Sequence, residues 1–247
     1  MLHPTQELEP PANPARFILT KLKSIENHLD QLSVAVEKVT RDRREDELKI
    51  LFAEVAADLQ GVETLSVRKN PVRVAESLQQ SLSRSLHKLM VHFERESEAE
   101  GAKFDEGYRI NRLWALAAAI RLCQEAIVQA LFWADELDAA KKIAGDELQR
   151  MVTLLQSFNP DRLSRRAIER IEDVDARRSK RLEVLAQART LELGLKGTVL
   201  SLVGQASIAD TLADSGIKGS AYLRSAQEDS SHSLLFLPAR AMSEVDA

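Results

Sequence analysis

The sequence is poor in cysteine, glycine, proline and aromatic residues. Its 247 residues contain one cysteine, Cys123, so no internal disulfide can form, and a reducing compartment, the cytoplasm, is expected. Nine glycines, seven prolines and an aromatic share of 4% are few for a strand-rich fold with many turns. At 44% hydrophobic residues the chain can still bury a core, so we expect an all-α fold of long helices.

Long uncharged runs are also lacking. The longest, residues 197–209, falls short of the roughly 20 apolar residues that a membrane span requires. The first residues are acidic and rich in proline, unlike a secretory signal. We therefore expect no membrane span and no export signal. The net charge of −4 means that any affinity for nucleic acid has to come from local basic surfaces.

Recognisable catalytic motifs are missing as well. The sequence has no Glu-x-x-His, His-Glu-x-x-His or Gly-x-Ser-x-Gly pattern. We therefore expect no metal, no cofactor and no enzymatic activity. An enzyme or small-molecule regulator with a pocket around Trp114 and Trp133, where bulky residues concentrate, stays open as an alternative.

What the sequence does have is apolar residues at coiled-coil spacing. In the segment 18–39 they alternate strictly at intervals of four and three, which is the pattern of a coiled-coil seam. The seam consists of Ile18, Leu22, Ile25, Leu29, Leu32, Val36 and Val39. Such a seam needs a partner helix, supplied by a hairpin partner or by a second copy of the chain, and we expect a homo-oligomer.

The pattern resumes in a shifted phase and predicts a helical hairpin. One seam is formed by Leu48, Phe52, Val55, Leu59 and Val62, and a second by Leu78, Leu82, Leu86, Leu89 and Phe93. Asn70 and Pro71 separate the two helices because proline disfavours the helical conformation of the preceding residue. We predict a flexible, proline-rich arm at 1–15 and a coiled-coil hairpin at 16–100.

The second half of the chain predicts a bundle of long helices over 105–214. Residues 105–158 form one very long helix or two helices bent around 135–138, and Asn159-Pro160 ends that stretch. A further helix spans 161–193 and is closed by Gly194 or Gly197, and a short helix covers 198–214. A mostly disordered tail is expected at 221–247, with an apolar segment at 234–238.

The helix predicted at 161–193 has its basic residues on one side. At about 100° per residue, its basic residues gather on one quarter of the circumference over about 28 Å. They are Arg162, Arg166, Arg170, Arg177, Lys180 and Arg181. An adjoining sector is apolar and includes Leu163, Val174 and Leu182. The basic face could pair with the acidic residues of 94–106, bind an acidic protein partner, or follow the phosphates of a nucleic acid.

The apolar segment of the tail resembles a short docking peptide. Leu234, Leu235, Phe236 and Leu237 would insert into a groove of another protein or fold back onto the bundle itself. The predicted function is a non-catalytic helical interaction protein, a scaffold or an assembly subunit with a protein partner. The alternative is an accessory nucleic-acid-binding protein that uses the basic face of the helix at 161–193.

Overall fold

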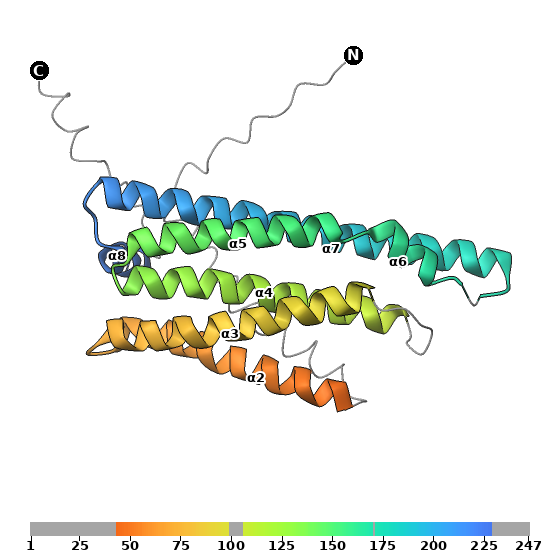
Figure 1. The fold of residues 1–247 in the computed structure, drawn as a ribbon, viewed down its shortest axis with the longest axis horizontal. Helices are drawn as coiled ribbons and strands as arrows, with labels where there is room; N and C mark the ends of the chain where they lie inside the picture. The colour runs from red at the N-terminus through yellow and green to blue at the C-terminus, as the bar shows by residue number, and fades with distance from the viewer. Residues whose placement is uncertain (1–42, 99–105, 170, 229–247) are drawn as a thin grey trace, which may run out of the picture.

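The computed structural model describes residues 43–98, 106–169 and 171–228 (Figure 1). Within these residues the chain forms α-helices, one short 3-10 helix and no strand, which confirms the predicted all-α class. The helices are α2 (Arg43–Glu63), α3 (Pro71–Glu98), α4 (Glu106–Trp133), α5 (Leu137–Ser157), α6 (Pro160–Arg166), α7 (Val174–Asp214) and α8 (Gly219–Glu228), and the 3-10 helix is η1 (Thr64–Val67).

The long helices run side by side and give an elongated bundle with α4 at its centre. In Figure 1, α2 and α3 lie on one side of α4, whereas α5 and α7 lie on the other side. α4 packs against all four of these helices and against α8. With 41 residues, α7 extends about 60 Å at 1.5 Å per residue. It forms one long edge of the molecule, and α2 forms the opposite edge.

The predicted seams supply the core. Every residue of the seam Leu48–Val62 is buried, and so are Leu82, Leu86, Leu89 and Phe93 of α3. α4 is buried over almost its whole circumference because helices surround it, which explains its wide apolar face. One continuous cluster of buried side chains joins α2 to α8, and it runs across the predicted division between the hairpin and the second bundle.

A tight corner separates α4 from α5. Asp135 adopts a left-handed backbone conformation with φ of 60°, which ends α4 and reverses the chain. Its side-chain Oδ1 accepts a hydrogen bond of 2.8 Å from the backbone N–H of Ser220 at the start of α8. Of the two alternatives for 105–158, the structure therefore has two helices bent at 135–138. The same aspartate attaches α8 to this corner.

The prediction of one continuous helix over 161–193 is wrong. α6 ends at Arg166, and α7 begins at Val174 after a turn. Asp173 caps α7, because its carboxylate accepts a 2.7 Å hydrogen bond from the backbone N–H of Ala176. The predicted stop at Gly194 or Gly197 is wrong as well, since α7 continues unbroken to Asp214.

The start of the predicted tail also needs correction. α8 occupies 219–228, and it buries Tyr222, Leu223 and Ala226 against the bundle. Burial of these three side chains compensates the cost of ordering so short a helix. The predicted arm at 1–15, the seam at 18–39 and the apolar segment at 234–238 lie outside the described residues.

Candidate functional site

The six basic residues do not share one helix. Arg162 and Arg166 lie on α6, Arg177, Lys180 and Arg181 lie on α7, and Arg170 is outside the described residues. The turn between α6 and α7 interrupts the stripe of about 28 Å expected from a continuous helix. The alternative function that used a single basic helix face therefore loses its geometric basis.

The two α6 arginines contact the end of α3. Arg166 Nη1 donates to the backbone oxygen of Glu98 at 3.0 Å, and Arg162 Nη2 lies 3.5 Å from the same oxygen. The last carbonyls of a helix have no partner within the helix and carry partial negative charge, so cations bind there. These arginines thus hold α6 against α3, and they contact a backbone oxygen in the predicted acidic region.

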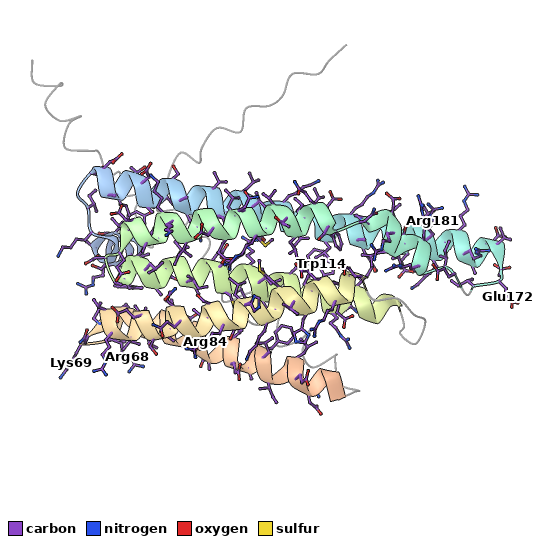
Figure 2. All side chains as sticks on the ribbon, in the orientation of Figure 1. Arg68, Lys69, Arg84, Trp114, Glu172 and Arg181 are labelled. Atoms are coloured by element: carbon purple, nitrogen blue, oxygen red, sulfur yellow. The ribbon has the colours of Figure 1, made fainter. Side chains whose placement is uncertain are left out.

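The three α7 residues lie near the exposed tip of the bundle, where Figure 2 labels Arg181 and Glu172. Lys180 forms an ion pair with Glu183 at 3.2 Å. Acidic side chains at Glu172 and Asp175 share this end of the molecule. The tip is therefore of mixed charge and does not present a purely basic surface.

The outer face of α7 is apolar and open to solvent. Leu182 is 61% exposed, Leu193 65%, Leu200 55% and Val203 47%. These four side chains recur on one side of the helix, opposite the buried Val184, Ala188, Leu191 and Leu195. The sequence prediction had placed Leu182 in the apolar sector of one continuous helix over 161–193, and in the structure this side chain is exposed on α7.

The exposed residues of α7 follow a strict alternation of four and three. All positions of this series are exposed, and we call them the α7 seam. The α7 seam consists of Leu182, Ala186, Arg189, Leu193, Lys196, Leu200, Val203 and Ser207. From Leu182 to Val203 it spans about 32 Å at the helical rise. Its spacing is that of a coiled-coil seam without a partner among the described residues.

A second exposed surface, on α3, is basic. Arg73, Arg84 and Arg95 are spaced eleven residues apart, close to three full turns, so they lie in a row along one face. Arg68 and Lys69 precede this row, and Figure 2 shows them at the end where α3 begins, with Arg84 further along the helix. Between positions 68 and 88 the single acid is Glu76. Sequence reasoning missed this row, although its eleven-residue spacing could have revealed it.

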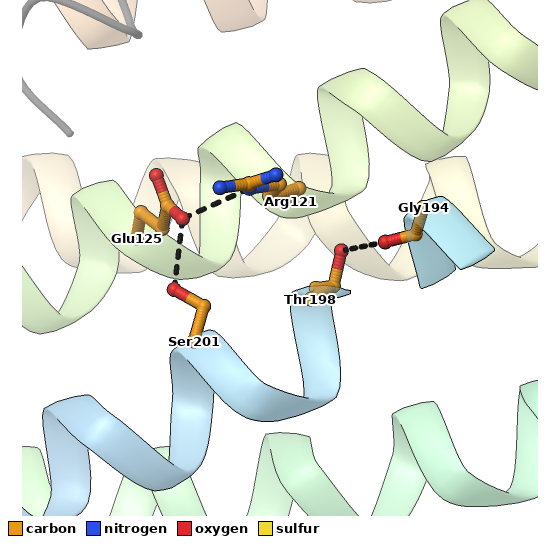
Figure 3. A network of polar contacts seen from close by, with 5 residues as sticks. All are labelled: Arg121, Glu125, Gly194, Thr198 and Ser201. Atoms are coloured by element: carbon orange, nitrogen blue, oxygen red, sulfur yellow. Dashed lines mark hydrogen bonds and ion pairs between the residues drawn. The ribbon is translucent and has the colours of Figure 1, made fainter. Parts of the chain in front are cut away.

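A buried polar layer joins α4, α5 and α7. Glu125 of α4 is buried, and its Oε1 accepts hydrogen bonds from Arg121 Nε at 3.0 Å and from Ser201 Oγ of α7 at 2.9 Å, as Figure 3 shows. Between α4 and α5, Gln124 donates to Glu147 Oε2 at 3.2 Å, and Arg150 of α5 pairs with Glu147 Oε1 at 2.7 Å. These bonds fix the register of the three helices.

The lone cysteine lies in the core between these helices. Burial raises the pKa of the Cys123 thiol above its usual range, and the nearby carboxylates of Asp58 and Glu147 raise it further. A thiol held in the protonated form is a poor nucleophile. Cys123 thus packs as a buried apolar side chain.

The two tryptophans do not line a common pocket. They are nineteen residues apart on α4, which places them about 28 Å from each other along the helix. Trp114 lies against Gly194 of α7, and Trp133 is buried under α8, where the Arg224 guanidinium stacks 5.8 Å from its ring centre. Among the described residues, no group of three or more His, Cys, Asp or Glu side chains is placed to hold a metal ion.

One described helix has the length and composition of a membrane span. It covers Ile110–Trp133, with a mean hydropathy of 1.4, and most of it is buried inside the bundle. It is not an uncharged run, because Arg112, Arg121 and Glu125 interrupt the apolar sequence.

Comparisons of this chain with protein-family models, with curated proteins and with solved structures gave no match.

Proposed function

We propose that this chain is a non-catalytic helical interaction protein of the cytoplasm, a scaffold or assembly subunit that binds another helix along the α7 seam. The observation that carries the proposal is the exposure of Leu182, Leu193, Leu200 and Val203 in one row. Single exposed leucines are ordinary on protein surfaces, but a row at coiled-coil spacing is typical of a helix-binding face.

The free energy of burying these four side chains is large enough to support binding of a helix. Full burial of one leucine or valine side chain contributes about 1.5–3 kcal/mol, so a helix covering all four would gain several kcal/mol from apolar area alone. The 32 Å length corresponds to about three heptads, the shortest length over which a coiled-coil pattern is sustained. The tail residues Leu234–Leu237 remain a second proposed contact.

The test is recovery of bound proteins by the intact chain at moderate salt, compared with two variants. Leu193→Glu with Leu200→Glu places charges in the α7 seam, whereas Val174→Glu makes the same change at an exposed residue outside it. We expect a protein that the native chain and the Val174→Glu chain retain and that the seam variant loses. Equal recovery by all three chains would refute binding through the seam.

A second candidate function, accessory nucleic-acid binding, is supported by the arginine row on α3. Charge reversal at Arg73 and Arg84 should abolish binding of a labelled oligonucleotide, and native binding should weaken steeply with salt through counterion release. Reversal at Arg177 and Arg181 tests the originally predicted basic residues. Binding that neither pair affects would remove this candidate.

A further inference from the structure

We infer that the α7 seam binds the segment 18–39 of a second copy of this chain, so that two copies exchange these segments. The inference rests on the proposed function and names the helix that the α7 seam binds. The sequence supplies a seam without an identified partner at 18–39, and the structure supplies another on α7. Both are amphipathic, and each needs apolar surface from elsewhere.

The two seams match in length and phase. The segment 18–39 places seven apolar residues at steps of four and three, from Ile18 to Val39. The first seven positions of the α7 seam, from Leu182 to Val203, follow the same order of steps. Each series extends over 21 residue steps, or about 32 Å as a helix. A helix over 18–39 would therefore cover these seven positions from end to end.

The charges favour this pairing over pairing of two α7 seams. The α7 seam contains two cations, Arg189 and Lys196, near its middle. Two antiparallel α7 helices centred on each other would bring Arg189 of one copy beside Lys196 of the other, and a parallel pair would bring like residues together. Such repulsion disfavours self-pairing. The seam at 18–39 carries no charge, and the long stems of Arg189 and Lys196 can pack on its leucines.

The segment 18–39 cannot bind the α7 seam of its own molecule, because the chain that connects it to α2 is too short. Three residues lie between Val39 and Arg43 at the start of α2, and the four Cα–Cα steps that join them span at most about 14 Å. α2 packs on α4, α4 packs on α7, and α2 and α7 lie at opposite edges of the bundle (Figure 1). The α7 seam is on the exposed side of α7, opposite the side chains that this helix buries in the bundle. At about 8–10 Å between packed axes, a helix on that outer face would lie about 24–30 Å from α2.

A segment that cannot reach its own α7 reaches that of a neighbour. When two copies bind reciprocally, both seams are covered and the contact repeats about a twofold axis. The assembly is then closed, and no apolar seam is left for a third copy. A head-to-tail chain of copies would leave one seam uncovered at each end, so we infer the closed form, a dimer in which each copy both donates a helix and accepts one.

The experiment measures the mass of full-length chains in solution by light scattering. One variant carries Leu193→Glu and Leu200→Glu in the α7 seam, and the other carries Leu22→Glu and Leu29→Glu in the segment. Matched controls are Val174→Glu on α7, and Thr20→Glu with Asn27→Glu on the opposite side of the predicted helix at 18–39. Circular dichroism establishes that each variant retains the native helix content.

We expect the native chain and both controls to have twice the 27.6 kDa mass of one chain, and each seam variant alone to have the mass of one chain. An equimolar mixture of the two variants should form dimers again, because one intact segment meets one intact α7 seam. This mixed dimer keeps only one of the two contacts, so its dissociation constant should exceed that of the native dimer by at least 100-fold.

Three results would overturn the inference: a native chain with the mass of one copy, a segment variant that stays dimeric, or variants that fail to associate when mixed. The same measurements distinguish failure of this inference from failure of the proposed function. If the α7 variant loses a bound protein whereas the segment variant keeps native mass and binding, the α7 seam binds a different helix. If the α7 variant matches the native chain in both mass and recovered proteins, the inference and the proposed function are both refuted.

Discussion

Ser201 donates a 2.9 Å hydrogen bond to the buried carboxylate of Glu125, and the two residues are 76 positions apart in the sequence. The bond joins α7 to the central helix α4. A buried carboxylate requires such donors, because an ionised group without them loses its hydration uncompensated.

Replacing Ser201 by alanine should therefore destabilise the bundle. Hydrogen bonds to charged groups contribute about 1.5–3 kcal/mol, and we expect a loss of about 2 kcal/mol in the free energy of unfolding. Urea unfolding measures this loss. Ser179→Ala, at an exposed position of the same helix, should change stability by less than about 0.5 kcal/mol. Equal effects at both positions would show that the bond to Glu125 contributes nothing.

The ion pair between Arg112 and Glu96 offers a second test. Arg112 is 3% exposed, and its Nη1 lies 2.6 Å from Glu96 Oε1, which joins α4 to α3. Removing one partner of a buried pair leaves a poorly compensated charge, so Glu96→Ala should cost about 3 kcal/mol. The exposed pair of Lys180 and Glu183 is the control, and Glu183→Ala should cost at most about 0.5 kcal/mol. Thermal unfolding of both variants compares the two losses.

Alanine substitutions at two glycines should change the stability of the chain in opposite directions. A Cβ at Gly219 would lie 2.6 Å from the backbone oxygen of Phe132, so Gly219→Ala should push α8 off α4 and cost about 1–3 kcal/mol. At Gly145, inside α5, a Cβ would meet nothing within 4 Å. Gly145→Ala should therefore stabilise the chain by about 0.5–1 kcal/mol through helix propensity. Melting temperatures should move in opposite directions, and a shared direction would contradict the close contact at Gly219.

The half-buried His92 predicts a pH dependence. Burial lowers the pKa of its imidazole below 6.5, Arg95 and Arg112 lower it further, and Glu47 and Glu96 oppose them. The unfolded chain thus binds a proton more readily than the folded chain. The stability contributed by neutral His92 is present above pH 6.5 and is lost as the pH falls through the lower pKa of the folded state.

Urea unfolding at pH 7.5 and 5.5 checks this dependence. The native chain should lose more stability on acidification than the His92→Gln chain. His87→Gln removes an exposed imidazole from the same helix and serves as the control. Equal losses in the native and His92→Gln chains would contradict the role of His92.

The sequence predicted the helices and most of the core, because apolar spacing reports directly on the buried face of a helix. Leu82, Leu86, Leu89 and Phe93 are buried as that spacing required. The corner at Asp135 was also within reach, since interrupted spacing left two helices as an alternative. Patterns of this kind are local, and a single sequence contains them fully.

The break between α6 and α7 was not predictable from spacing. No glycine or proline lies between Arg166 and Val174, and the apolar pattern runs on with little interruption. The available signal was Asp173, a good N-cap residue inside a helical pattern. Missing it joined two helices into one, and the six basic residues were then assigned to a single helix face. The continuity of α7 through Gly194 and Gly197 depends on packing against α4 and α5, which no local pattern encodes.

The central place of α4 has a consequence for synthesis on the ribosome. α2 and α3 emerge first and can cover one side of α4, whereas α5 and α7 emerge after it. Until about residue 214 has left the exit tunnel, the other side of the apolar helix Ile110–Trp133 is exposed to solvent. Nascent chains stalled near residue 170 should therefore bind a hydrophobic-surface dye or a ribosome-associated chaperone more strongly than full-length chains. Equal binding by both would show that α4 is already protected before α7 is made.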